Sequence, residues 1–372
     1  MPVPLDEYPV HQVPLSMRYM ETSDRNSYDR SYWNAQDRTG EVFLVTGLGV
    51  YPNLGVIDAY ATIATPGRQV AVRMSDALGD DRMVQQVGPY RIEVIEPLQK
   101  LRLVCEAEDQ GITFDLTWNG SFPTHEEPRH ETRAGTRILL DAARFAQVGS
   151  WEGTLRVDDR TWDVTPDTWL GSRDRSWGIR PVGEQPGPGR PDETPGGRSF
   201  WWLYTPFRFD DFFLFVIAQE DGDGRRSMNE AIRVWPDGRT EQLGWMDIEI
   251  AYRSGSRHPE RAVMHLRDED KKPFDIEFET LGFVALALGS GYGGDDWTHG
   301  KWMGEGWVDR VSFDLSDAEL RARIPFGMLD HVARGTIRGG THDGQVGHGL
   351  FEHTNVGRHA PSGFADLMSV AP

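Results

Sequence analysis

Trp169-Leu-Gly-Ser-Arg-Asp-Arg-Ser-Trp-Gly-Ile-Arg-Pro181 lies near the middle of the 372-residue chain and combines two Trp, three Arg and one Asp. Charged side chains persist in a protein interior only when they are paired. One interpretation is therefore a buried ion-pair network of Arg173, Asp174 and Arg180 that joins two halves of the molecule. The other is that these side chains line a site. A Pro- and Gly-rich segment follows directly, so we interpret the stretch as the last strand of a first domain.

Alternation of apolar and polar residues predicts antiparallel β-structure in both halves of the chain. In Ile112-Thr-Phe-Asp-Leu-Thr-Trp118 every second side chain is apolar, and Phe274-Asp-Ile-Glu-Phe278 repeats this pattern. Turn signals such as Pro236-Asp-Gly238 separate the runs. Short alternating runs bounded by turns are typical of β-meanders rather than of helical domains.

Helical signals are few. Ser316-Asp-Ala-Glu319 has the form of a capping box and predicts a short helix that continues to Ile324. The section from Phe122 to Ala146 is less regular, and within it we interpret Asp141-Ala-Ala-Arg-Phe145 as one helical turn. No other segment sustains helical periodicity, so neither an α/β nor an all-α fold is expected.

The fold class that we expect is all-β, with two antiparallel β-barrel domains packed side by side. Closed barrels hide their strand edges, and a barrel of about eight strands can enclose one small ligand. Pro and Gly dominate the residues between Val182 and Arg198, as in a linker. The predicted division is an N-terminal arm over residues 1–30, a first barrel over 31–185, a linker over 186–198 and a second barrel over 199–372.

Composition excludes several classes of partner. The formal net charge is −19 and the chain has no basic run, so nucleic acid and anionic membrane surfaces are poor partners. The longest strongly apolar run, Phe212–Ala218, is too short to span a bilayer. Cys105 is the only cysteine and cannot form an intrachain disulfide.

The first residues carry no secretory signal, and we expect a cytoplasmic protein. The oligomeric state stays open, a homodimer included.

A second notable segment, Gly291–Trp307, mixes ionisable residues with aromatic ones. One interpretation is a loop followed by a strand whose aromatic side chains fill a barrel. The other is an apolar pocket that holds a few ionisable groups, in which a carboxylic acid keeps its proton to higher pH. The ionisable residues are Asp295, Asp296, His299 and Glu305, and the aromatic residues are Trp297, Trp302 and Trp307.

We expect neither a metal nor a cofactor. His348, Glu352 and His353 invite a metal hypothesis, but their segment has the pattern of a strand. Residues five apart on a strand point to opposite faces, so His348 and His353 would diverge. The sequence contains no phosphate loop, and the glycine-rich Gly289–Gly294 has no strand–helix context for a dinucleotide.

The central stretch resembles a known signature. Gly171-Ser-Arg-Asp-Arg-Ser-Trp-Gly-Ile-Arg180, followed by Trp201-Trp202, is similar to the Arg-Asp-His-Ser-Trp-Gly motif of the carotenoid 1,2-hydratase/AttH-like superfamily. That superfamily includes tocopherol-cyclase-like and Diels–Alderase-like members. Gly349-Leu-Phe-Glu-His353 resembles a C-terminal element of bacterial relatives. The motif departs from the usual pattern at Arg175, which replaces a His and does not titrate usefully.

The resemblance implies two lipocalin-like, calycin-type barrels with an apolar pocket near their junction. It also implies cofactor-free hydration, cyclisation or isomerisation of an apolar, terpenoid- or polyketide-like molecule, begun by a carboxylic acid that protonates an alkene. The alternative is a non-catalytic carrier of lipids or hydrophobic small molecules. A metal-dependent hydrolase, suggested by the His-rich C-terminal stretch, is a third class.

Asp174 is the first candidate for the acid, with Arg173 and Arg180 as its electrostatic partners. If these arginines hold Asp174 ionised, the acid is instead Asp296, Glu305 or Glu352. Further residues are expected to contact the substrate, namely Trp177, Trp201, Trp202, Trp302, His299 and His353.

Overall fold

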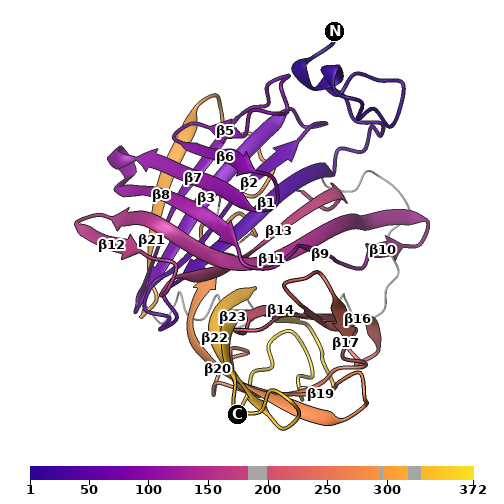
Figure 1. Ribbon diagram of the computed structural model, residues 1–372. Coiled ribbons are helices and arrows are strands. Elements are labelled where there is room, and N and C mark those ends of the chain that lie inside the picture. Colours follow the sequence, from indigo (N-terminus) through magenta and orange to yellow (C-terminus); the bar gives the residue numbers. More distant parts are fainter. Residues whose placement is uncertain (183–198, 294–295, 317–327) are drawn as a thin grey trace.

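The computed structural model describes residues 1–182, 199–293, 296–316 and 328–372. Nearly all its regular elements are strands, which form two curled antiparallel sheets (Figure 1). The only helical elements in the described ranges are two short 3-10 turns, η1 (Pro4–Glu7) and η2 (Glu108–Gln110). The expected all-β class is confirmed.

The first sheet runs, from edge to edge, through β21 (Trp307–Asp314), β4 (Arg68–Ala77), β3 (Val56–Thr65), β2 (Phe43–Tyr51), β1 (Ser27–Gln36), β13 (Leu170–Ile179), β11 (Arg137–Val157), β8 (Ile112–Gly120), β7 (Lys100–Ala107), β6 (Tyr90–Glu96) and β5 (Gln86–Val87). Three further strands pair with β11, namely β9 (His125–Glu126), β10 (His130–Ala134) and β12 (Arg160–Val164).

The second sheet has nine strands. Their order is β17 (Thr240–Gln242), β16 (Arg226–Val234), β15 (Phe213–Glu220), β14 (Phe200–Arg208), β23 (Val346–Val356), β22 (Leu329–Arg338), β20 (Pro273–Ala285), β19 (Pro259–Arg267) and β18 (Asp247–Tyr252). Figure 1 shows this sheet below the first, with β11 crossing the region between them.

Side chains fill the interior of each curled sheet. On β8, the alternating residues Ile112, Phe114, Leu116 and Trp118 are all buried in the core of the first sheet. There the Trp118 ring packs edge-on against those of Trp33 and Trp151, at centroid distances of 5.5 and 5.1 Å. A separate core fills the second sheet. The concave interiors are therefore packed, and space for a ligand has to be sought elsewhere.

A third apolar cluster lies at the junction, between the outer faces of the two sheets. It includes Val45 and Val148 of the first sheet and Tyr204, Phe215 and Leu350 of the second. Strands at the junction are consequently buried on both faces. A strand with two buried faces is rich in apolar residues, and β15 (Phe-Leu-Phe-Val-Ile-Ala-Gln-Glu) has this composition.

The structure differs from the sequence interpretation in two places. β21 belongs to the second half of the chain, yet it pairs with β4 at the edge of the first sheet, for example Trp307 opposite Ser75. The division at residues 186–198 therefore does not separate the two sheets completely. The predicted helical turn at Asp141–Phe145 is wrong, because these residues pair with β13 as part of the long strand β11.

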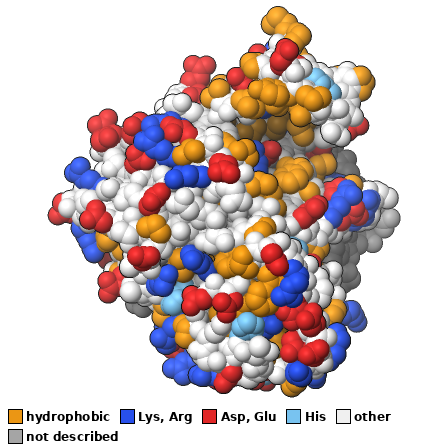
Figure 2. Space-filling model, in the orientation of Figure 1, with side chains coloured by type: hydrophobic (Ala, Val, Ile, Leu, Met, Phe, Trp, Pro, Cys, Tyr) orange, Lys and Arg blue, Asp and Glu red, His pale blue; other side chains and the backbone are white. Residues whose placement is uncertain are grey.

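Two predicted segments lie outside the described residues: the linker at 186–198 and most of the helix that was expected to begin at Ser316. At the N-terminus, β1 begins at Ser27, and apolar side chains of the preceding segment, such as Tyr8 and Leu15, are exposed. Figure 2 shows many acidic side chains spread over the visible face, in keeping with the net charge of −19.

No helix in the described part of the chain has the length and apolar character needed to cross a membrane.

Replacement of Trp118 by Ala should lower the free energy of unfolding by about 3–5 kcal/mol, because it leaves a cavity in the core of the first sheet. Trp302→Ala is the matched control, since the Trp302 side chain is 49% exposed whereas Trp118 is fully buried. Urea denaturation followed by circular dichroism measures both. Equal losses for the two variants would contradict this description of the core.

Candidate functional site

A cavity of about 850 Å³ lies at the junction of the two sheets. β1 and β13 contribute one wall, β14 and β23 another, and β10 and β11 a third. Tyr292 and His299, from the segment that precedes β21, complete the lining. The cavity thus lies between the two sheets and not within either of them.

Strand alternation decides which residues of the central stretch reach this cavity. On β13 the even-numbered Asp174 and Ser176 line it, and Arg180 follows just beyond the strand. The odd-numbered Arg173 points to the other face, where its guanidinium carbon lies 4.9 Å from the Trp33 ring centroid. The Arg173 Nε donates to Gln147 Oε1 at 2.8 Å. The motif therefore contributes some side chains to the cavity and others to the packing on the opposite face of the sheet.

Strand alternation also separates neighbouring side chains on β14 and β23, so that one residue of each adjacent pair faces the cavity and the other does not. Trp202 of β14 and Glu352 of β23 line the cavity. Their neighbours Trp201 and His353 point into the interior of the second sheet, where the two rings pack against each other at 5.3 Å. His353 Nε2 lies 3.0 Å from the Tyr252 hydroxyl, so this imidazole has a structural partner.

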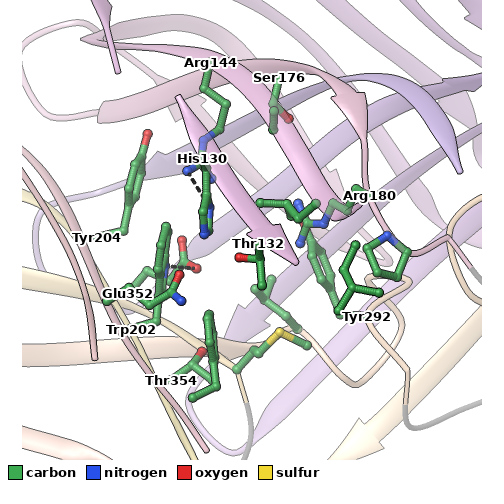
Figure 3. A pocket seen from close by; sticks show the side chains of 18 of the residues that line it. His130, Thr132, Arg144, Ser176, Arg180, Trp202, Tyr204, Tyr292, Glu352 and Thr354 are labelled. Carbon is green, nitrogen blue, oxygen red and sulfur yellow. Dashed lines mark hydrogen bonds between the residues drawn. The ribbon is translucent and has the colours of Figure 1, made fainter. Parts of the chain in front are cut away.

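Glu352 is a half-buried carboxyl group fixed by one hydrogen bond. The Trp202 Nε1–H donates to Glu352 Oε1 at 2.9 Å (Figure 3). Burial raises the pKa of Glu352 to about 8, the neighbouring Asp330 adds to this rise, and Arg144 and Arg180 oppose it. The side chain therefore carries a proton at neutral pH and is equipped to act as an acid.

Asp174 lies across from Tyr32 in the β1–β13 ladder. Burial raises its pKa to about 7, and Glu127 and Glu352 act in the same direction. Arg144 and Arg180 lower the pKa, but burial outweighs them. Both lining carboxyl groups therefore keep their protons to higher pH than a carboxyl group in water.

Asp330 of β22 is a fully buried carboxyl group, directly opposite Glu352 in the β22–β23 ladder. The Tyr32 hydroxyl donates to Asp330 Oδ2 at 2.5 Å, which connects the two sheets across the junction. Burial raises the pKa of Asp330, although this hydrogen bond opposes the rise. Tyr32 itself lines the cavity.

Aromatic rings and one ion pair build the wall around Glu352. The His130 ring stacks on Trp202 with a centroid distance of 5.6 Å and an interplanar angle of 9°. Arg144 forms an ion pair with the buried Glu127, with Nε 2.9 Å from Oε2. The Tyr204 hydroxyl donates to the other oxygen of Glu127 at 2.9 Å. Burial lowers the pKa of His130 to about 4, so its ring is neutral.

At another part of the cavity lies a group of cations and phenols. The guanidinium carbons of Arg30 and Arg180 lie 5.8 and 5.7 Å from the centroid of the Tyr292 ring. Nearby, His299 Nδ1 is 3.4 Å from Asp58 Oδ1. Burial lowers the pKa of His299 to about 4, so this imidazole is also neutral.

The structure brings together five of the twelve residues that the sequence nominated. These cavity-lining residues are Asp174, Arg180, Trp202, His299 and Glu352. Arg173, Trp201 and His353 are buried in the sheet interiors instead, and Trp177 is 43% exposed.

The remaining three residues, Asp296, Glu305 and Trp302, are exposed and lie outside the lining. Asp296 forms an ion pair with Arg73, with Oδ1 2.8 Å from Nη1, and this contact lowers the pKa of Asp296. Its environment favours the charged form, which is the opposite of what an acid requires. We therefore retain neither Asp296 nor Glu305 as a candidate acid.

The residues of the site and its surroundings that sequence reasoning missed include Arg30, Tyr32, His130, Arg144 and Asp330. Alternation within Ser27–Gln36 places Tyr28, Arg30 and Tyr32 on one face, a signal that was available. Arg144 was hidden because its segment was interpreted as a helical turn. Among the described residues no group of three or more His, Cys, Asp or Glu is arranged to hold a metal ion.

Comparisons with known proteins agree with this fold. A family described as "Family of unknown function (DUF8625)" matches residues 3–365. No curated protein matches the sequence. The structure of an AttH-like protein from Nitrosomonas europaea is similar, with a TM-score of 0.54 at 12% identity over 95% of this chain and 99% of that chain.

Two further solved structures are similar. CghA has a TM-score of 0.52 at 10% identity, over 89% of this chain and 88% of that one. Kievitone hydratase from Nectria haematococca has a TM-score of 0.49 at 13% identity, over 92% of this chain and 93% of that one. The AttH-like protein and CghA share the fold of this chain, so the expected double lipocalin-like fold is confirmed.

Glu352→Gln should make stability less dependent on pH. The pKa of Glu352 is about 8 in the folded protein, against 4.5 for an unperturbed glutamate, so the folded state binds the proton more tightly. Wild-type stability should therefore fall as pH rises from about 5 to 8, by up to about 1 kcal/mol per pH unit from this group. The variant lacks that contribution, and thermal melts between pH 5 and 9 should show a flatter profile. Parallel profiles for the variant and the wild type would contradict the raised pKa.

Proposed function

The chain belongs to DUF8625, a family of unknown function, and we propose that its junction cavity carries out a cofactor-independent lyase or isomerase reaction of the hydratase or cyclase type. The observation that carries the proposal is the pair of carboxyl groups, Asp174 and Glu352, in an aromatic cavity that keeps them protonated to unusually high pH. The proposed substrate is a largely apolar small molecule with an isolated alkene.

Aromatic faces around Glu352 suit an apolar substrate and a cationic intermediate. Phe200, Trp202 and Tyr204 form a continuous stack, with centroid distances of 5.9 and 6.3 Å between successive rings. All three line the cavity. The faces of such rings attract positive charge, most strongly where water is excluded. The ion pair with Glu127 balances the charge of Arg144, a cation in the cavity lining.

In the proposed reaction Glu352 acts as the general acid. Its proton is transferred to one alkene carbon, the electron pair of the double bond forms the new C–H bond, and the other carbon becomes cationic. The carboxylate that remains stabilises this cation electrostatically. The Trp202 indole N–H, which already donates to Glu352, orients the carboxyl group for this transfer.

Asp174 acts as the general base in the second half of the reaction. For hydration, it takes a proton from the water that adds to the cation; for isomerisation, it takes a proton from a neighbouring carbon. Two carboxyl groups whose environments separate their pKa values are a recurring basis for such a division of roles. The earlier candidate acid, Asp174, is therefore proposed as the base, because its pKa of about 7 leaves a substantial ionised fraction at slightly alkaline pH.

The test begins with recovery of the small molecule that co-purifies with the protein, identified by mass spectrometry. Turnover in D₂O should place one solvent deuterium on the protonated carbon. Glu352→Gln should lower kcat by about 10²–10⁴, the usual contribution of general acid catalysis. Glu305→Gln, which alters an exposed carboxylate outside the cavity, should retain full activity.

The pH profile separates the two roles. kcat/KM should be bell-shaped, with its maximum between about pH 7 and 8, since the base must be ionised and the acid protonated. Asp174→Asn should remove the acidic limb, and Glu352→Gln the alkaline limb of the residual activity. A ligand that binds and returns chemically unchanged, without deuterium, would instead favour the carrier hypothesis.

A further inference from the structure

Two guanidinium groups in the cavity have no anionic partner. Arg30 is 8% exposed and Arg180 is half-buried, and both line the cavity. Among the described residues neither guanidinium group forms an ion pair or a hydrogen bond. Their contacts are with the faces of Tyr28 and Tyr292. The third lining arginine of the interior, Arg144, differs because Glu127 neutralises it.

The carboxyl groups nearby form no ion pair with either guanidinium group in the described part of the chain, although the charge of Asp58 attracts Arg30 at longer range. Asp58 is already engaged by Gly300, whose N–H donates to Oδ2 at 2.7 Å, and by Tyr51, whose hydroxyl donates to Oδ1 at 3.3 Å. Glu352 keeps its proton to high pH, and Asp174, which is partly ionised at slightly alkaline pH, forms no ion pair with either guanidinium group among the described residues. A buried guanidinium without a counter-ion is costly, and proteins keep such groups where a ligand supplies the partner.

We propose that Arg30 and Arg180 bind a carboxylate on the substrate, so that the natural ligand is an amphipathic acid with an apolar body. This inference rests on the proposed function only in that it takes the ligand to be the substrate. It concerns how the ligand is bound and not how it reacts. A guanidinium group presents paired N–H donors that match the two oxygens of a carboxylate. The Tyr28 and Tyr292 rings would hold the two cations in place beside it.

This anchor sets the direction in which the substrate lies. Figure 3 shows Arg180 and Tyr292 on one side of the cavity and Glu352 with Trp202 on the other, with Thr132 between them. A carboxylate bound at the arginines directs the apolar body towards the aromatic stack. The reacting alkene then lies remote from the acid group of the ligand. Because the protein as a whole has a net charge of −19, selection of an anion has to come from this local pair of cations.

Two matched pairs of probes test the inference: retinoic acid against retinol, and decanoic acid against decanol. Each pair shares its apolar body and differs in the anionic group. Binding is measured on the full-length protein at slightly alkaline pH, by quenching of Trp fluorescence for the retinoids and by calorimetry for the others. Wild-type protein should bind at least one acid about tenfold or more tightly than its neutral partner, since charge-assisted hydrogen bonds are lost with the alcohol.

Arg180→Met and Arg30→Met should each remove most of this preference, weakening the acid about tenfold and the alcohol less than threefold. Arg175→Met is the matched control. Arg175 is on β13, the strand that Arg180 directly follows, but it lies outside the cavity lining and pairs with Asp29 at 3.0 Å. This variant should keep the preference, and near-UV circular dichroism verifies the fold of all three. Arg180→Lys, which retains the positive charge, should keep part of the preference for the acid over the alcohol.

The inference is overturned if wild-type protein binds acid and alcohol equally, if it binds neither acid, or if Arg180→Met weakens both partners to the same degree. These outcomes are distinct from a failure of the proposed function. A protein that selects acids but returns every ligand unchanged refutes the reaction and retains the anion site. A protein that transforms neutral alkenes without any preference for acids refutes the anion site alone.

Discussion

Strands β1, β14 and β23 are buried on both faces over most of their length, and the rest of the molecule depends on this double burial. One face of each strand packs into the interior of its own sheet, and the other faces the opposite sheet across the junction. A polar side chain on the junction face has no access to bulk water, so it must be paired, be neutral or face the cavity. Three pairs of side chains satisfy this requirement. Two are hydrogen-bonded, namely Trp202 with Glu352 and Tyr32 with Asp330, and the third is the ion pair of Arg144 with Glu127. The site is thus a consequence of how two sheets bury their outer faces.

The same burial gives the carboxyl groups their chemistry. An exposed carboxylate such as Asp296 is ionised beside its arginine, and its environment lowers its pKa. Asp174 and Glu352 also have arginines nearby, yet their pKa values rise because removal from water outweighs the attraction. The stability that this burial costs at neutral pH is offset by the apolar clusters on either side. Acid strength in this cavity is therefore set by the packing of the sheets and not by any single partner.

The sequence was sufficient for the fold class, since alternation in runs such as Ile112–Trp118 reports directly on which side chains are buried. It also located the two most informative segments, because Asp174 and Glu352 both stand in motifs that were singled out. The sequence also nominated Arg173, Trp201 and His353 for the site, but these residues, which belong to the same motifs, face the sheet interiors. Strict alternation would have separated them from Asp174, Trp202 and Glu352. Asp330 and Arg144 lay beyond such reasoning, since their role arises only when strands distant in sequence meet at the junction.

The pairing of β21 with β4 bears on how the molecule is made. Because β21 comes from the last quarter of the chain, the first sheet lacks an edge strand until most of the polypeptide has left the ribosome. The edge of β4 stays unpaired until β21, more than half a chain length further on, has been synthesised. Pairings between such distant segments form slowly. The segment that carries Tyr292 and His299 precedes β21 directly, so the wall of the cavity is completed by the same late event. An incompletely synthesised chain would therefore possess the strand that carries Asp174 but not the complete wall of the cavity, which would form only at the final stage of folding.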